Sequence, residues 1–557
     1  MLLRSEVGLP ARRSIQPDRH ADRGGGANVT NRERWTLIAA VLGSSIVFVD
    51  SSVVNVALPR IGRELPTTIF GVLEGQSYVY NGYLLTLSSL LILAGALSDF
   101  YGRRRLFLIG LVGFGVTSVL CGLAPNMEFL VLSRLLQGAA GAVLVPGSLA
   151  LLTSSFTGEA RGRAFGVWAA ASAGTTILGP FVGGVFVDTL SWRAAFLINV
   201  PLVLLAVWAT LQHVQETRNE KASGRFDWLG AAVVAIAVGG LSFGLIYGQQ
   251  RDWRDPLGYW AFAAGVVATI AFPFLMARSR DPLVPLDLFQ SRNFTVTNIS
   301  TFLIYGALGV TFYYLALFLQ GVLGYSAAAA GLAGIPGGLL LVLLSTRFGA
   351  LAARRGPRFY MCVGPALMAA GMIWFARVPA TSPAWVLKPG DLSSWVPPAE
   401  YFIDFLPGQI VFGFGLAMMV APLTTALMTS VPVRNSGVAS AINNAISRVG
   451  PQLAGAVIFV AITATFYNGL AARLPGTSPS DPELRRDFPP LLVPNTNDPR
   501  AIASRDQSTE AFHLAAIIGA ALCATGALVN FFGISDEVAL RAERGEAAAA
   551  EQVVAGT

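Results

Sequence analysis

The sequence is poor in charged residues for its length. Of 557 residues, only 13% are Asp, Glu, Lys or Arg, whereas 54% are hydrophobic. A soluble chain of this length would carry about 25% charged residues and would divide into several domains. The shortage of charge, with a mean hydropathy of +0.58, therefore excludes a soluble multidomain protein.

Lysine, cysteine and histidine are also scarce. The two lysines, Lys221 and Lys388, follow Glu and Leu, so the chain has no Gly-Lys-Ser/Thr phosphate loop and is not an ATP-driven pump. The three cysteines lie in apolar segments and imply no disulfide framework. The three histidines are far apart, so we expect no metal site and no cofactor. The net charge of +7 is scattered over short loops without a basic face, which argues against nucleic-acid binding.

The sequence instead contains one long apolar segment after another, many near the roughly 20 residues that cross a bilayer. We predict an all-α polytopic membrane protein with 14 transmembrane helices. The predicted spans are 36–58, 77–98, 106–124, 128–152, 164–187, 194–212, 228–248, 258–276, 295–319, 328–348, 359–376, 403–429, 437–466 and 511–533. No polar segment between them is long enough for an enzymatic domain, so we do not expect an enzyme.

The distribution of positive charge orients these spans. With both termini inside, the inner segments hold about 25 Lys and Arg residues and the outer segments about 12, as the positive-inside rule requires. We therefore expect a multi-pass protein of the cytoplasmic (inner) membrane with both termini in the cytosol. Residues 1–34 lack the apolar core of a signal peptide. We interpret 1–34 and 535–557 as cytosolic tails, the first of them disordered, and 467–510 as an extracytoplasmic loop.

Three pairs of similar motifs indicate an internal repeat. "GALSDFYG" (95–102) resembles "GALAARRG" (349–356), "VPGSLALLTS" (145–154) resembles "VAPLTTALMTS" (420–430), and "GVWAAASAGTTILGPFVGG" (166–184) resembles "GVASAINNAISRVGPQLAG" (437–455). Each pair is separated by eight spans. The pattern predicts two parallel six-helix repeats, 35–213 and 294–534, with two inserted central helices in 214–293.

Two opposite charges lie deep in the first half. Asp50 lies about nine residues, or ~13 Å, from the outer end of its span, and Arg134 about seven residues, or ~10 Å. A buried acid and base at one depth should pair, because each is costly in the membrane. Asp50 is either a helix–helix hydrogen-bonding group or a proton site, since burial disfavours its charge and Arg134 favours it.

The motifs together resemble a known family. "GALSDFYGRRR", "LSRLLQGAAGA" and "GTTILGPFVGG" resemble loop and helix signatures of the major facilitator superfamily, and "VDSSVVNVALP" resembles the first helix of its fourteen-helix drug:proton antiporters (the EmrB/QacA type). The resemblance covers nearly the whole chain outside the tails. It implies the major facilitator fold and secondary active export of small molecules, driven by the proton gradient through alternating access.

Two groups of motif residues are interpreted as moving parts. The loop residues Gly95, Asp99, Gly102, Arg103 and Arg104 form either a positively charged loop or a latch at the inner gate, with Asp99 pairing with an arginine or capping the third span. The fifth-span residues and their second-half counterparts form either tight helix packing or a hinge and seal between the halves. They are Gly174, Gly179, Pro180, Gly183, Gly184, Gly450 and Pro451.

The substrate is the least determined feature. Aromatic and polar residues of the spans could line a cavity or simply pack, namely Tyr78, Asn81, Tyr83, Trp168, Tyr305, Tyr313, Tyr314, Gln320, Asn443 and Gln452. Arg448 contacts the substrate, locks the second half or is a satisfied interior arginine. No acid lies in the tenth or thirteenth span, so we expect neutral, singly cationic or amphipathic drugs and antibiotics, not dications.

Alternative functions remain. They are export of one lipid, siderophore or metabolite, and a membrane sensor that does not transport. We expect the lipid bilayer as a partner and a monomer, and the sequence leaves a periplasmic adaptor open.

Overall fold

The computed structural model describes residues 30–537 except 70, 71, 157, 218–225, 252, 281, 389, 432–435, 475 and 494–497. Within this part of the chain, every regular element is a helix. In chain order they are α1 (Asn31–Glu64), α2 (Val72–Tyr101), α3 (Arg103–Gly122), α4 (Met127–Ser155), α5 (Gly158–Thr189), α6 (Ala194–Leu197), α7 (Asn199–His213), α8 (Trp228–Gln250), α9 (Pro256–Arg278), η1 (Leu286–Gln290), α10 (Arg292–Leu317), η2 (Phe318–Val322), α11 (Ala327–Arg355), α12 (Arg358–Phe375), η3 (Leu392–Trp395), α13 (Tyr401–Asp404), α14 (Leu406–Thr429), α15 (Ser436–Arg473), α16 (Pro482–Asp487) and α17 (Pro499–Gly533).

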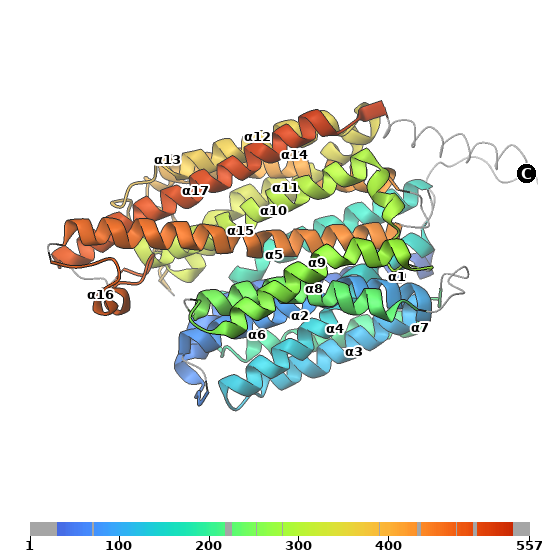
Figure 1. Ribbon diagram of the computed structural model, residues 1–557, viewed down its shortest axis with the longest axis horizontal. Coiled ribbons are helices and arrows are strands. Elements are labelled where there is room, and N and C mark those ends of the chain that lie inside the picture. Colours follow the sequence, from blue (N-terminus) through green and yellow to red (C-terminus); the bar gives the residue numbers. More distant parts are fainter. Residues whose placement is uncertain are drawn as a thin grey trace, which may run out of the picture.

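The long helices run side by side along one direction, as Figure 1 shows. Among the described residues, 13 helical segments are long and apolar enough to cross a membrane. The 32-residue α5 lies at the remaining predicted span, so the structure has a long helix at each of the 14 predicted positions. Interior prolines such as Pro146 and Pro422 are tolerated because neighbouring helices satisfy the freed backbone groups.

Two predicted boundaries differ from the helix ends in the structure. Residues 31–34 belong to α1, where Thr30 and Glu33 form a capping box, so the predicted tail ends earlier. The predicted outer loop 467–510 is largely helical, because α15 continues to Arg473 and α17 begins at Pro499. Arg473 joins these two extensions through ion pairs with Asp506 and Glu510. Both extensions and α16 project beyond the bundle in Figure 1.

The inserted pair α8 and α9 forms a close hairpin. A Cβ atom on Gly240 would lie 2.8 Å from the Ala261 carbonyl oxygen, and one on Gly258 would lie 3.0 Å from the Gly248 Cα. Small residues let the two backbones approach closely, as is common in membrane proteins. Because α8 also packs on α2 and α15, the hairpin contacts both predicted halves.

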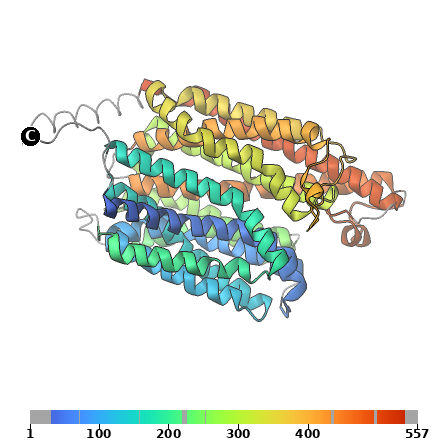
Figure 2. The same ribbon diagram turned by 180° about the vertical axis from the view of Figure 1, so that it is seen from behind.

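The two halves are packed together at one end of the molecule. That end carries the start of α1 and the end of α17, as Figures 1 and 2 show from opposite sides. One buried cluster there combines first-half residues such as Leu91 and Leu151 with Leu427 and Ile442 from the second half. At the opposite end, the halves have separate clusters, one around Trp192 and one around Phe466. The structure is therefore closed at the end that carries the termini.

Candidate functional site

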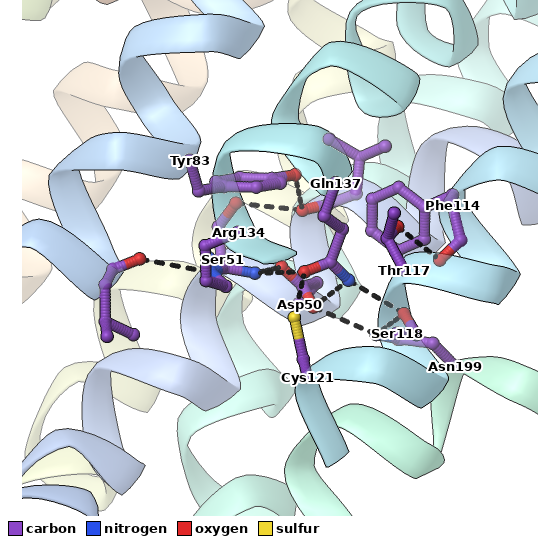
Figure 3. A network of polar contacts seen from close by, with 12 residues as sticks. Asp50, Ser51, Tyr83, Phe114, Thr117, Ser118, Cys121, Arg134, Gln137 and Asn199 are labelled. Atoms are coloured by element: carbon purple, nitrogen blue, oxygen red, sulfur yellow. Dashed lines mark hydrogen bonds and ion pairs between the residues drawn. The ribbon is translucent and has the colours of Figure 1, made fainter. Parts of the chain in front are cut away.

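A buried ion pair links α1 to α4. Asp50 and Arg134 are both fully buried, and Arg134 Nη1 donates to Asp50 Oδ2 at 2.5 Å. The pairing predicted from their depths is present. Figure 3 shows it at the centre of a network of polar side chains from α1, α3, α4 and α7.

The second carboxylate oxygen of Asp50 accepts two further hydrogen bonds. Gln137 Nε2 donates to Asp50 Oδ1 at 3.0 Å, and Asn199 Nδ2 donates to the same atom at 2.9 Å. The Ser118 hydroxyl lies between these two amides and accepts from both, at 2.7 and 3.3 Å. Asp50 thus accepts hydrogen bonds from three side chains.

Arg134 has its own shell of partners. Its Nε donates to the Val79 carbonyl at 3.1 Å, and its Nη1 also donates to Gln137 Oε1 at 2.7 Å. The Tyr83 ring lies 4.0 Å from the Arg134 Cζ and the Phe196 ring 5.6 Å. Among the described residues, Nη2 has no hydrogen-bond partner although it is buried. The guanidinium therefore lies near two aromatic rings, and its Nη2 group has no partner in the described part of the chain.

The Asp50 carboxylate can take up one proton on one of its oxygens. When Asp50 is ionised, its charge and that of Arg134 cancel, which lowers the free-energy cost of burying both. A proton on Asp50 would remove the ion pair and leave Arg134 as an uncompensated buried charge, which favours a rearrangement of α1 against α4. Sequence reasoning missed Gln137, Asn199 and Ser118. Gln137 had a usable signal, because it lies three residues after Arg134 on the same helix face.

The predicted gating loop contains a helix cap that sequence reasoning also missed. Gly102 has φ +110° and precedes α3, whose first N–H groups need acceptors. The Glu216 carboxylate, from the segment after α7, accepts from the backbone N–H of Arg104 at 3.1 Å and of Arg105 at 3.0 Å. Arg104 Nη2 donates to the Leu211 carbonyl at 2.8 Å.

The second half repeats this arrangement. Gly356 has φ +94° and precedes α12. The Asp536 carboxylate, after α17, accepts from the Arg358 backbone N–H at 2.9 Å, and Arg358 Nε donates to the Phe531 carbonyl at 2.9 Å. In each half, an acid thus ties the end of the last helix to the start of the third. The side chain of Asp99 lies outside the described residues, so its predicted pairing and capping stay predictions. Gly95 lies near Ala441 of α15, and a Cβ there would be 3.5 Å from the Ala441 Cβ.

The fifth-span glycines differ from one another. Gly179 packs directly on Ser52 of α1, and a Cβ on Gly183 would lie 2.8 Å from a Val53 methyl group. A Cβ on Gly184 would reach Val56 at 3.8 Å, whereas one on Gly174 would meet nothing within 4 Å. Gly179 and Gly183 therefore form the α1–α5 contact. The side chain of Pro180 lies outside the described residues.

The corresponding second-half residues make a similar contact between α10 and α15. A Cβ on Gly450 would lie 2.8 Å from the Phe302 carbonyl oxygen, and one on Gly309 would lie 2.5 Å from the Pro451 Cβ. In both halves the first helix thus meets the fifth at the Gly-Pro motif. These contacts support close packing, and a hinge role stays a prediction.

Several predicted cavity residues make structural hydrogen bonds. Trp168 Nε1 donates to Ser44 Oγ at 2.8 Å, Asn81 Nδ2 donates to Ser77 within its own helix, and Asn443 Nδ2 donates to Thr301 Oγ1 at 2.8 Å. Gln320 lies exposed in η2, at the end of the bundle away from the termini, and its role in a cavity stays a prediction. Tyr78 is half-buried in α2.

Comparison with known proteins gives consistent matches. The family model described as Major Facilitator Superfamily matches residues 40–455. The chain is 34% identical over 473 residues to "Multidrug resistance protein Stp" of Mycobacterium tuberculosis, covering 84% of this chain and 82% of the relative. It is 32% identical to "Puromycin resistance protein pur8" of Streptomyces alboniger, covering 81% and 85%.

Solved structures support the same architecture. The human organic anion transporter MFSD10 matches 90% of this chain and 100% of its own with a TM-score of 0.56 at 14% identity. A bacterial homologue of the lysosomal transporter Spinster matches 93% and 99% with the same score at 15% identity. At such identities the likeness concerns the fold alone. With the family model matching most of the sequence, this multi-pass membrane protein belongs to the Major Facilitator Superfamily.

Proposed function

We propose that the protein is a proton-coupled exporter of amphipathic drugs, antibiotics or similar small molecules. The observation that carries the proposal is the fully buried Asp50–Arg134 pair, because an intramembrane acid is costly and is retained where a proton or ion is handled. Relatives named for resistance to puromycin and methylenomycin A, and for export of tetracenomycin C, support the substrate class.

The coupling step is a change in the protonation of Asp50. A proton arriving from outside neutralises the carboxylate and releases Arg134, so the closed and open arrangements differ in charge at the contact of α1 with α4. Release of that proton on the inner side restores the pair. The energy comes from the proton gradient, and the mechanism needs no cofactor.

The location follows from charge distribution. Both termini lie on the cytosolic side of the cytoplasmic membrane, where the Arg-rich loops at 102–105 and 353–358 face anionic lipid and cytosol. The end closed by the shared apolar cluster is then the cytosolic end. The protein works as a monomer in the bilayer, and its partner is the transported small molecule.

Transport in reconstituted vesicles tests this function. Vesicles with an imposed pH gradient and a panel of puromycin, methylenomycin A and tetracenomycin C would compare the unaltered protein with Asp50→Asn. We expect at least one compound to accumulate against its gradient with the unaltered protein. With Asp50→Asn, this accumulation should be at least tenfold lower. The variant should keep downhill exchange. Glu400→Gln, at an exposed carboxylate outside the site, is the matched control.

Full gradient-driven accumulation by Asp50→Asn would contradict the proton-site role. If no compound on a broad panel moved, the exporter proposal itself would fail.

A further inference from the structure

A second deep arginine has no partner among the described residues. Arg448 lies in α15, ten residues after the start of its apolar span at Val438, or ~15 Å along the helix. Its Nε is buried without a hydrogen-bond partner. Unlike Arg134, it makes no ion pair, hydrogen bond or close ring contact with any residue that the structure describes. Burying an isolated charge at this depth is costly unless another group pairs with it.

The surroundings of Arg448 are polar and aromatic. Tyr80 and Tyr83 of α2 and Tyr305 of α10 lie within its electrostatic reach, and Tyr80 is likewise close to Tyr313 of α10. Because α2 belongs to the first half and α10 and α15 to the second, Arg448 lies between the halves. Its side chain is half-buried although it lies deep along α15.

The same helix face supplies further polar groups. Asn444 and Gln452 lie one turn before and one turn after Arg448, both half-buried, and Gln452 Oε1 is buried without a partner in the described part of the chain. The middle parts of α2, α10 and α15 contain no acidic residue. Helices α10 and α15 contain no Asp or Glu, and those of α2 lie near its two ends, at positions 74 and 99.

We propose that Arg448 binds the anionic group of an aromatic amphiphile beside these tyrosines. A guanidinium with free donors matches a carboxylate, sulfonate or phosphate, while tyrosine rings pack on an aromatic body and their hydroxyls donate hydrogen bonds. A cation would be repelled. The inference rests on the proposed export function, and it replaces the expectation of singly cationic substrates.

The position of Tyr83 connects this site to the proton site. Its ring lies against Arg134, and its hydroxyl lies within electrostatic reach of both Asp50 and Arg448. Tyr83 would therefore lie near both a substrate anion at Arg448 and the Asp50–Arg134 pair. Exchange of one proton inward for one anion outward would also move net charge across the membrane.

Equilibrium binding of three matched pyrene probes tests the proposal without transport. Pyrenebutyrate is anionic, pyrenebutanol neutral and pyrenebutylamine cationic, and all three share one aromatic body. With purified protein in phosphatidylcholine nanodiscs, we expect the affinity to fall at least tenfold from pyrenebutyrate to pyrenebutylamine. This ranking uses the unaltered protein, so it does not depend on the folding of a variant.

Substitutions then assign the preference to one side chain. Arg448→Gln should weaken pyrenebutyrate binding at least tenfold and change pyrenebutanol binding less than twofold, while Arg448→Lys should keep part of the preference. The control is Arg473→Gln, at an arginine of the same helix that already has acidic partners. Equal weakening of the acid and the alcohol, or an unchanged preference in Arg448→Gln, would overturn the proposal.

A lipid headgroup could supply the same anionic chemistry. Adding phosphatidylglycerol to the nanodiscs distinguishes the two sources. If it leaves pyrenebutyrate binding unchanged, the site takes a free amphiphile; if it competes in the unaltered protein but not in Arg448→Gln, the anion is a lipid phosphate. Both results support an anion site. Because binding is read without a proton gradient, failure here is distinct from failure of proton coupling at Asp50.

Discussion

At the residue scale, the buried Asp50–Arg134 pair is part of a larger polar network. Asp50 receives one charged and two neutral hydrogen bonds from side chains of α4 and α7. Gln137 has a central place, because it contacts Asp50, Arg134 and Ser118 at once. A buried polar group that loses its partner costs the full desolvation penalty, so the members of the network should be energetically coupled.

Gln137→Leu should therefore destabilise the protein. The leucine would leave Asp50, Arg134 and Ser118 each without one partner, at a cost of about 1–3 kcal/mol. The measurement is the thermal unfolding midpoint of the purified protein in detergent. In combination with Asp50→Asn, the loss should be smaller than the sum of the two single losses, because both remove the same contacts.

The control for this prediction is Gln320→Leu, at an exposed glutamine far from the network. Equal midpoint shifts in Gln137→Leu and Gln320→Leu, or strict additivity with Asp50→Asn, would show that the network is not a coupled unit.

At the element scale, helix contacts depend on glycines at particular positions. Gly174 and Gly179 lie in the same helix and the same sequence motif, yet only Gly179 is pressed against α1. The shared motif does not predict which of the two contacts α1, because this depends on which face of α5 lies against Ser52.

Gly179→Ala should be harmful and Gly174→Ala should not. The added methyl group at position 179 meets the Ser52 side chain, and such overpacking costs about 1–3 kcal/mol. At position 174 the space is open and alanine favours a helix. Thermal unfolding and vesicle transport would measure both variants. If Gly174→Ala abolished transport without loss of stability, a hinge at Gly174 would be supported instead.

The repeated helix caps make a second prediction at this scale. Glu216→Ala and Asp536→Ala each remove a carboxylate that accepts backbone N–H groups at a helix start, which costs about 0.5–2 kcal/mol. The two sites lie in different halves and share no partner among the described residues. The loss of stability of the double variant in thermal unfolding should therefore equal the sum of the two single losses. A double variant no less stable than either single variant would contradict independent caps.

At the scale of the whole molecule, much of the architecture was predictable from sequence. Apolar runs predict crossing helices because a bilayer leaves the backbone few alternatives, and the depths of Asp50 and Arg134 predicted their pairing. The projection of α15 and α17 beyond the bundle was not predictable, because its contacts, such as those of Arg473 with acids 33 and 37 residues later, are long-range. Nor were the contacts of the donor Asn199 and of the acceptor Glu216, which reach their partners through tertiary packing rather than spacing.

The closed end of the molecule corresponds to one state of a transport cycle. One apolar cluster joins both halves at the end with the termini, while Asp50 is paired with Arg134. Alternating access requires this cluster to separate in another state. We expect a change of charge at Asp50 to shift the balance between the two states.

Proton movement driven by substrate tests this coupling most directly. Vesicles loaded with a transported compound and a pH-sensitive dye would be diluted into compound-free medium. We expect efflux of the compound to acidify the lumen with the unaltered protein and with Glu400→Gln, whereas Asp50→Asn should release the compound without moving protons. Lumenal acidification by Asp50→Asn at the rate of the unaltered protein would show that Asp50 is not the coupling site.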